Sequence, residues 1–190
     1  PSSANSSTLL TRVLAGGTLA GTGTVQGKLT ITSGGMLSTG DSAGAEIGTL
    51  TVNGDAIFAS GSAALLQIRT PSYNNPGSLY ITDAAYETWR SGVLTDAFSG
   101  GLSDLITTAQ HDRLAAAGII SIAPGTQVTL DNDGYTPQAG DIIQLFRGSS
   151  IAGMLNVGPQ YRTGLETGLD LILFALGGNL VWAVSPFNTH

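Results

Sequence analysis

The sequence contains no cysteine, few charged residues and no long hydrophobic run. The absence of cysteine from all 190 residues excludes disulfides and thiolate metal sites. Charged residues make up 11% of the chain, against roughly 25% in a typical soluble domain. The seven basic residues are scattered singly within a net charge of −6, so no basic face is expected to bind nucleic acid. The longest apolar stretch is interrupted by Gly177, Gly178 and Asn179 and falls short of the ~18 residues of a membrane span, so no membrane insertion is expected.

Glycine and short apolar segments are abundant instead. The chain has 27 glycines, and 42% of its residues are hydrophobic, which is enough to form a core. From Leu9 to Ile68, short alternating apolar runs are separated by Gly, Asn, Asp or Ser. Each run is too short for a helix, and its Thr, Val and Ile residues favour strands. Residues 1–9, which begin with small polar side chains, are predicted to form a flexible arm.

Two internal matches predict a repeating coil. "KLTITSGGMLSTGD" (28–41) matches "TLTVNGDAIFASGS" (49–62) at an offset of 21 residues, and "GGTLAGTG" (16–23) matches "GGMLSTG" (34–40) at an offset of 18. Repeats of about 20 residues made of short strands are typical of a parallel β-helix, in which coils stack ~4.8 Å apart and align like residues. We therefore expect an all-β fold, a β-solenoid with short coils of about 18–21 residues. The offset of 21 also predicts that Gly34 stacks beside Asp55, and Asp41 beside Ser62.

The repeat pattern is interrupted between residues 70 and 112. The segment "DAAYETWRSGVLTDAF" places Tyr86 and Trp89 on one face of a predicted helix, so we expect a partly helical insertion packed on the solenoid. Strand patterns return afterwards, and the last two flank Gly-Gly-Asn, which predicts a C-terminal antiparallel β element. The expected organisation is an arm (1–9), solenoid repeats (10–69), an insertion (70–112) and a C-terminal β region that completes or caps the solenoid (113–190).

Part of the sequence resembles a bacterial family. The turn "GDSAG" (40–44) followed by "GTLTV" (48–52) is similar to the autotransporter-associated β-strand repeats of bacterial surface and secreted proteins. Residues 111–148 resemble the block that often follows such repeats, with its turn at 134–141. The resemblance implies an extracellular β-helical scaffold without shared catalytic residues. The chain also begins at Pro1 without Met or an apolar leader, which predicts a processed product that is secreted or lies at the cell surface.

Two short motifs suggest chemistry. "GDSAG" fits the nucleophile elbow of serine hydrolases, but a strand rather than a helix follows it, and only His111 and His190 are available as a base. Asp131 and Asp133 begin a partial calcium loop whose twelfth position is Ile142 instead of a bidentate Glu, so they are weak metal candidates. We therefore expect no catalytic residue, no metal site of the usual calcium-loop type and no cofactor.

A self-assembling structural protein is the leading hypothesis. The two ends of a solenoid expose unpaired backbone groups, and low charge removes the repulsion that would oppose stacking. We expect an extracellular protein that assembles with itself, head to tail, into a filament, sheath or surface layer. The predicted subunit interface consists of Leu9, Leu10, Val13, Leu14, Leu180, Val181, Trp182, Val184 and Phe187.

Two alternatives stay open at this point. A monomeric secreted or surface-anchored β-helical adhesin would bind glycans or cell-surface proteins through aromatic side chains. Its candidate contacts are Tyr73, Tyr80, Tyr86 and Trp89. The third hypothesis is a polysaccharide-degrading enzyme, although the acids of the repeats do not stack in the pairs that glycosidases need.

Overall fold

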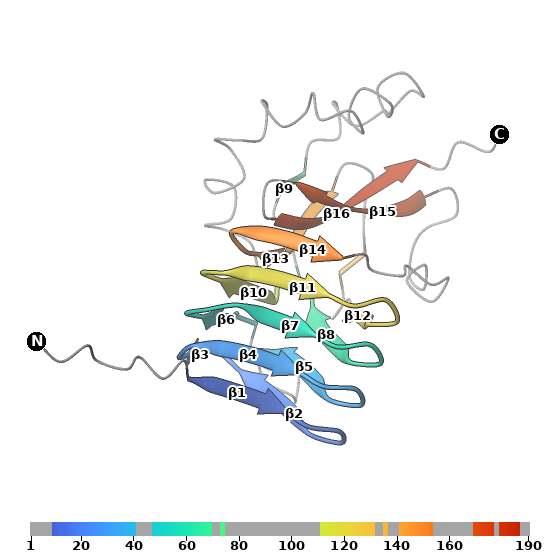
Figure 1. The fold of residues 1–190 in the computed structure, drawn as a ribbon. Coiled ribbons are helices and arrows are strands. Elements are labelled where there is room, and N and C mark those ends of the chain that lie inside the picture. The colour runs from blue at the N-terminus through green and yellow to red at the C-terminus, as the bar shows by residue number, and fades with distance from the viewer. Residues whose placement is uncertain are drawn as a thin grey trace, which may run out of the picture.

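The computed structural model is a parallel β-solenoid made of stacked coils (Figure 1). It describes residues 9–40, 47–69, 73–74, 111–131, 135–136, 141–153, 169–176 and 179–186. Within these ranges all regular secondary structure consists of strands. Each complete coil contributes one strand to each of three sheets, A, B and C. The predicted all-β solenoid is confirmed.

Successive coils pass through the sheets in the order A, B, C. Sheet A is parallel and contains β1 (Leu10–Val13), β4 (Lys28–Ile31), β7 (Ala56–Phe58), β11 (Ile119–Ile122) and β14 (Ser150–Gly153). Sheet B is also parallel and contains β2 (Thr18–Gly21), β5 (Met36–Thr39), β8 (Ala63–Gln67) and β12 (Gln127–Asp131). The parallel part of sheet C contains β3 (Gly23–Val25), β6 (Thr49–Val52), β10 (Arg113–Ala116) and β13 (Asp141–Arg147).

Antiparallel strands complete sheet C at the C-terminal end of the solenoid. β16 (Asn179–Pro186) pairs with β13 on one side and with β15 (Leu169–Leu176) on the other. The short strand β9 (Tyr73–Asn74) also pairs with β13. The predicted C-terminal antiparallel element is therefore confirmed, and it lies at the opposite end of the stack from β1 (Figure 1).

The coils differ in length. Leu10 pairs with Lys28, an offset of 18 residues. The next coil pairs Leu29 with Ala56, an offset of 27, and the following one pairs Ala56 with Ile120, an offset of 64. The same offset holds in sheets A and B for each of these coil pairs, so the register is kept although the coil length changes.

One of the two sequence matches gave the coil repeat correctly. The 18-residue match is confirmed, because Thr18 pairs with Met36. The 21-residue match is wrong as a coil repeat, since it superposes β4 of sheet A on β6 of sheet C, two strands of the same coil. Gly34 consequently does not stack beside Asp55. Its N–H donates to the carbonyl oxygen of Gly61 at 2.8 Å.

Four equivalent turns join sheet A to sheet B. The third residue of each is a glycine with φ between 73° and 85°: Gly16, Gly34, Gly61 and Gly125. The N–H of the fourth residue donates to the carbonyl of the first, as Gly35 does to Thr32 at 2.9 Å. A positive φ at the third position is the requirement of a type II turn, which glycine meets without steric cost. These turns keep every A-to-B connection at the same length.

Length variation is concentrated at the corner between sheets B and C. A single residue separates β2 from β3, whereas nine separate β5 from β6 and nine separate β12 from β13. β8 and β10 are separated by a much longer connection, which contains β9, and Ile68 and His111 near its two ends form an isolated antiparallel bridge. The helix predicted within 70–112 lies outside the described residues.

The hydrophobic core lies between the three sheets. Aligned inward-facing side chains from successive coils fill it, such as Leu29, Ala56 and Ile120 in sheet A, all of which are fully buried. Phe58 of sheet A and Phe146 of sheet C stack in the interior with ring centroids 5.3 Å apart. Burial of these continuous ladders is the main source of the stability of the stack.

Candidate functional site

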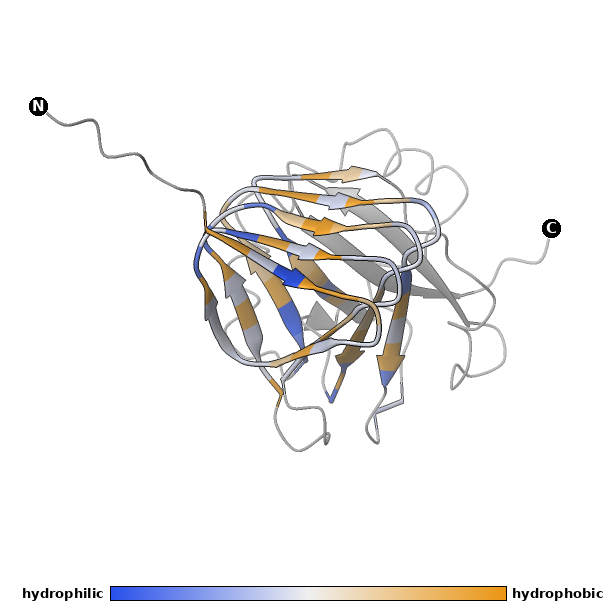
Figure 2. Cartoon of the chain, turned by 60° about the horizontal axis from the view of Figure 1, so that its bottom comes forward, coloured by the Kyte–Doolittle hydropathy of each residue, from blue (hydrophilic) through white to orange (hydrophobic). Residues whose placement is uncertain are grey.

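All three sheets end at the first coil. β1, β2 and β3 are the edge strands of sheets A, B and C, so each has a row of backbone N–H and C=O groups with no strand partner among the described residues. Figure 2 looks toward this coil at the N-terminal end of the solenoid. Stable solenoids need a polar cap at each end, so a coil that no described residue covers is a candidate docking surface.

Exposed leucines gather around β1. Leu9, Leu10 and Leu14 are 60%, 54% and 61% exposed. Ile119, at 43%, is the other large hydrophobic side chain found exposed within the described ranges. Val13, which was predicted in the same interface, is instead buried in the core. Three of the four interface residues predicted at this end are therefore accessible for contact.

The interior of the first coil is filled by smaller side chains than the coil above it. Thr11 lies at the position that Leu29 occupies in the second coil, and Gly23 at the position of Leu50. Gly21 similarly replaces Thr39 in sheet B. Less apolar area is thus buried between the first two coils than between the next ones. We therefore expect the first coil to be bound to its neighbour less strongly than the coils in the middle of the stack are bound to theirs.

The predicted C-terminal half of the interface lies on β16 and beyond. Four of its residues, Leu180, Val181, Trp182 and Val184, are in β16, whereas Phe187 is outside the described chain. β16 has a strand neighbour on both sides, β13 and β15. Its backbone therefore has no free edge for a further strand, and the outer strand of sheet C at this end is β15.

A buried polar cluster closes the B–C corner where the chain returns to the stack. The Asp112 side chain is fully buried, and its two carboxylate oxygens accept hydrogen bonds from the N–H groups of Gly48 (2.9 Å) and Gln67 (3.0 Å). The N–H of Asp112 donates in turn to the carbonyl of Gln67 at 2.7 Å. One carboxylate thereby joins the start of β6 to the end of β8. Sequence reasoning missed this residue, because "HDRL" looks like an ordinary polar connection.

Burial shifts both acid–base groups of this corner away from their charged forms. It raises the pKa of Asp112 to about 6, although the N–H groups of Gly48 and Gln67 counteract the rise. It lowers the pKa of His111 to about 4, against the effect of a hydrogen bond from Nε2 to the carbonyl oxygen of Gln144 at 2.9 Å. At neutral pH the cluster therefore holds a carboxylate that binds two N–H groups and a neutral imidazole. These roles are structural, since the groups are used in closing the corner.

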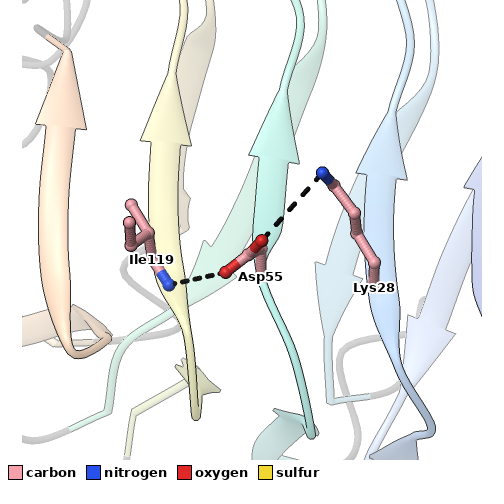
Figure 3. A network of polar contacts seen from close by, with 3 residues as sticks. All are labelled: Lys28, Asp55 and Ile119. Carbon is pink, nitrogen blue, oxygen red and sulfur yellow. Dashed lines mark hydrogen bonds and ion pairs between the residues drawn. The ribbon is translucent and has the colours of Figure 1, made fainter. Parts of the chain in front are cut away.

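A second polar contact spans three coils on the outer surface of sheet A (Figure 3). Asp55 accepts a hydrogen bond from the N–H of Ile119 at 3.0 Å, and its other carboxylate oxygen lies 4.0 Å from Nζ of Lys28. Both charged side chains are partly exposed to solvent, so the ion pair adds little to stability. The hydrogen bond to Ile119 matters more, because it fixes one coil against the next.

The residues predicted for chemistry are not brought together in the described chain. Asp131 ends β12 and is exposed, and its carbonyl accepts a hydrogen bond from the N–H of Ile68, while Asp133 lies outside the described residues. Within the described ranges no three His, Asp or Glu side chains are close enough together to hold a metal ion. The "GDSAG" turn beyond Gly40 also lies outside these ranges.

The predicted aromatic contacts fall mostly outside the described residues as well. This applies to Tyr80, Tyr86 and Trp89. Tyr73 lies in β9, where its backbone pairs with Ile142. Of the four candidate aromatic contacts, Tyr73 is thus the one that lies within the described residues, in a strand next to β13.

No family model matches the chain, and no curated protein matches it. In the part of the chain that the structure describes, no helix is long and apolar enough to cross a membrane.

Proposed function

We propose that this chain is an extracellular structural protein whose β-solenoid self-associates through its first coil. The observation that carries the proposal is the coincidence of three open strand edges with the exposed side chains of Leu9, Leu10 and Leu14. Uncovered strand edges and contiguous apolar side chains both favour association with another β edge. The low content of charged residues, 11%, offers little repulsion against such a contact.

The extracellular location is supported by the resemblance to autotransporter-associated repeats. The assembled form is a filament, sheath or surface layer if copies join head to tail, or discrete particles if they join by the same end. A head-to-tail contact requires that the outer strands β14, β12 and β15 accept the first coil of the next copy. Sheet A ends in the fifth coil, sheet B ends in the fourth, and sheet C continues two strands past β13, so these outer strands do not form an even surface for the first coil of the next copy.

Sedimentation and negative-stain electron microscopy of the purified full chain test the proposal. We expect species larger than one chain, which dissociate in a Leu10→Lys/Leu14→Lys variant because charged edge residues oppose strand addition. Deletion of residues 1–8, which leaves β1 intact, is the matched control and should preserve assembly. A wild-type chain that sediments as a monomer at every concentration contradicts the proposal.

A second candidate is the adhesin, and one observation favours it. Within the parallel coils, every connection longer than four residues lies at the B–C corner. In repeat proteins, insertions on one face often form the binding surface. A glycan-array and cell-binding comparison of the wild type with Trp89→Ala tests this candidate. Unchanged binding, or none by the wild type, argues against it.

A further inference from the structure

The two ends of the solenoid do not match each other. At the first coil, β1, β2 and β3 belong to one turn and end the three sheets together. At the other end, sheet A finishes with β14 of the fifth coil and sheet B with β12 of the fourth. Sheet C continues past β13 with the two antiparallel strands β16 and β15. The surface that best matches an even three-strand edge is another even three-strand edge.

We propose that two copies of this chain pair through their first coils about a two-fold axis. The proposal rests on the proposed self-association and names its partner and geometry. A two-fold axis perpendicular to the solenoid and passing through sheet A reverses the direction of every strand. β1 then pairs antiparallel with β1 of the second copy, and β2 pairs with the β3 of that copy. Such a contact is self-complementary and closed, so it yields a dimer and no filament.

The exposed leucines place the axis at β1. Leu9, Leu10 and Leu14 all lie in or beside this strand, so the contact that buries most apolar surface is the one between the two β1 strands. If the two-fold axis passed through sheet B or sheet C instead, these leucine side chains would lie at the edge of the contact.

The burial pattern limits the register of the two β1 strands. Leu10 and Arg12 are exposed, whereas Thr11 is half-buried and Val13 is buried. Antiparallel pairing must match the two faces of the strands, so the axis passes through a residue, and the two residues that pair most of β1 with its copy are Thr11 and Arg12. An axis at Arg12 places like charges directly opposite each other, which destabilises the pair. With the axis at Thr11, the aliphatic part of Arg12 covers Leu10 of the second copy.

A single cysteine tests this geometry, because the chain has no cysteine of its own. Directly opposed residues of antiparallel strands have Cα atoms about 4.5–5.5 Å apart, within the range that a disulfide bridges. We expect Thr11→Cys to form a covalent dimer under mild oxidation. Ile119→Cys, exposed on the same sheet but away from the first coil, should stay a single chain on the same gel.

The outcomes separate this proposal from the more general one. In a head-to-tail contact, position 11 of one copy never meets position 11 of another. Assembly that is sensitive to Leu10→Lys but gives no Thr11→Cys dimer therefore overturns the two-fold pairing and leaves self-association standing. Cross-linking by Arg12→Cys in place of Thr11→Cys overturns the register. If the wild type does not associate at all, both proposals fail.

A substitution pair completes the test. Leu10→Lys combined with Thr11→Cys should give at least tenfold less cross-linked product than Thr11→Cys alone, because a charge at the strand edge opposes pairing. Ile119→Lys combined with Thr11→Cys is the matched control on the same sheet, and should cross-link as Thr11→Cys alone does. Equal cross-linking in the two combinations would show that the Leu10 edge does not stabilise the contact, and would contradict the apolar docking at β1.

Discussion

Single glycines determine how closely the coils stack at the corner between sheets C and A. A Cβ at Gly118 would contact the Asp55 carboxylate and lie 2.9 Å from the Asp55 backbone nitrogen. One at Gly54 would lie 2.7 Å from the carbonyl oxygen of Gly27. Because the neighbouring atoms are mostly backbone, they cannot move aside without separating two coils.

We expect Gly118→Ala to destabilise the fold by about 1–3 kcal/mol, the usual cost of forcing extra volume into a packed site. It should also weaken the hydrogen bond between Asp55 and the N–H of Ile119. Urea unfolding followed by circular dichroism measures the effect. Ala117→Ser, at an exposed neighbouring position, is the control and should stay within about 0.5 kcal/mol of the wild type. Equal stability of both variants would show that the corner is looser than described.

His111 and Asp112 have opposite effects on the pH dependence of stability. The folded-state pKa of His111, about 4, lies below its usual 6.5, so the unfolded chain binds more protons in that interval and acidification destabilises the fold. The folded-state pKa of Asp112, about 6, lies above its usual 3.8, so acidification favours the fold through this group. Each shift corresponds to about 3 kcal/mol, and the two contributions largely cancel.

Replacing one partner should reveal the contribution of the other. Relative to the wild type, His111→Gln should gain up to about 3 kcal/mol of stability as the pH falls from 6.5 to 4. Asp112→Asn should lose stability over the same interval, in addition to about 1–3 kcal/mol at neutral pH from the impaired bonds to Gly48 and Gln67. Urea midpoints at pH 4.5, 5.5 and 7.5 give the comparison. Parallel pH profiles for both variants and the wild type would refute this assignment.

At the scale of elements, two contacts that close the B–C corner come from residues on either side of the segment between residues 70 and 110. The bridge between Ile68 and His111 brings the two ends of that segment together, and Asp112 joins the coil on both sides. We therefore expect a variant in which four Gly/Ser residues replace 70–110 to fold with the same β spectrum. The shorter loop lowers the entropic free-energy cost of loop closure by about 2 kcal/mol. This gain offsets the loss of the pairing between β9 and β13.

The matched control combines this replacement with Asp112→Ala. Without the carboxylate, the N–H groups of Gly48 and Gln67 lose their acceptor, and the corner should open. Cooperative urea unfolding of the first variant and a broadened, earlier transition of the second are the expected results. Loss of folding in the first variant would mean that the segment contributes to the core.

The strands and their class were predictable from the sequence, whereas their order in space was not. β4 ("KLTI") and β6 ("TLTV") have the same alternation of half-buried and buried positions, although they belong to different sheets. Every strand of a three-sided coil buries one face, so alternation cannot tell which sheet a strand joins. The better guide was the A-to-B turn, where Ala15, Ser33, Ser60 and Pro124 each precede the glycine of positive φ.

The candidate docking surface was predicted in part. Leu9, Leu10 and Leu14 were identifiable, because apolar residues in the terminal coil of a solenoid have few partners. The inward orientation of Val13 depends on where β1 begins, and strand boundaries are poorly encoded by local sequence. The interior position of β16 depends on pairing with β13, which is distant in sequence. Likewise, no local signal shows that Asp112 is buried, since its partners come from two other coils.

At the scale of the whole molecule, stability should increase from the first coil toward the middle of the stack. Among the described residues the first coil has one neighbouring coil, and its inward positions include Thr11 and Gly23. Since each coil of a solenoid contacts only its neighbours, end coils open more often than central ones. We expect amides of β1 to exchange with deuterium on the order of tenfold faster than those of β7 at low protein concentration.

Association should then change this gradient in a specific way. If the first coil docks, β1 amides become protected as the concentration rises, while those of β7 do not change. Hydrogen exchange read by mass spectrometry at several concentrations measures both segments in one sample. Concentration-independent exchange of β1 would contradict docking at this end, and uniform exchange of all coils would contradict the gradient.

The constant register at changing coil length has a consequence for protein engineering. Strand pairing sets the rise per coil at ~4.8 Å however many residues a coil contains. The C-terminal ends of β5, β8 and β12, where the connections to sheet C begin, therefore lie on one line, with the outer two about 10 Å apart. Peptides grafted at these three positions would be displayed at a fixed molecular spacing. The fold thus provides a one-dimensional lattice for presenting epitopes or enzyme fragments side by side.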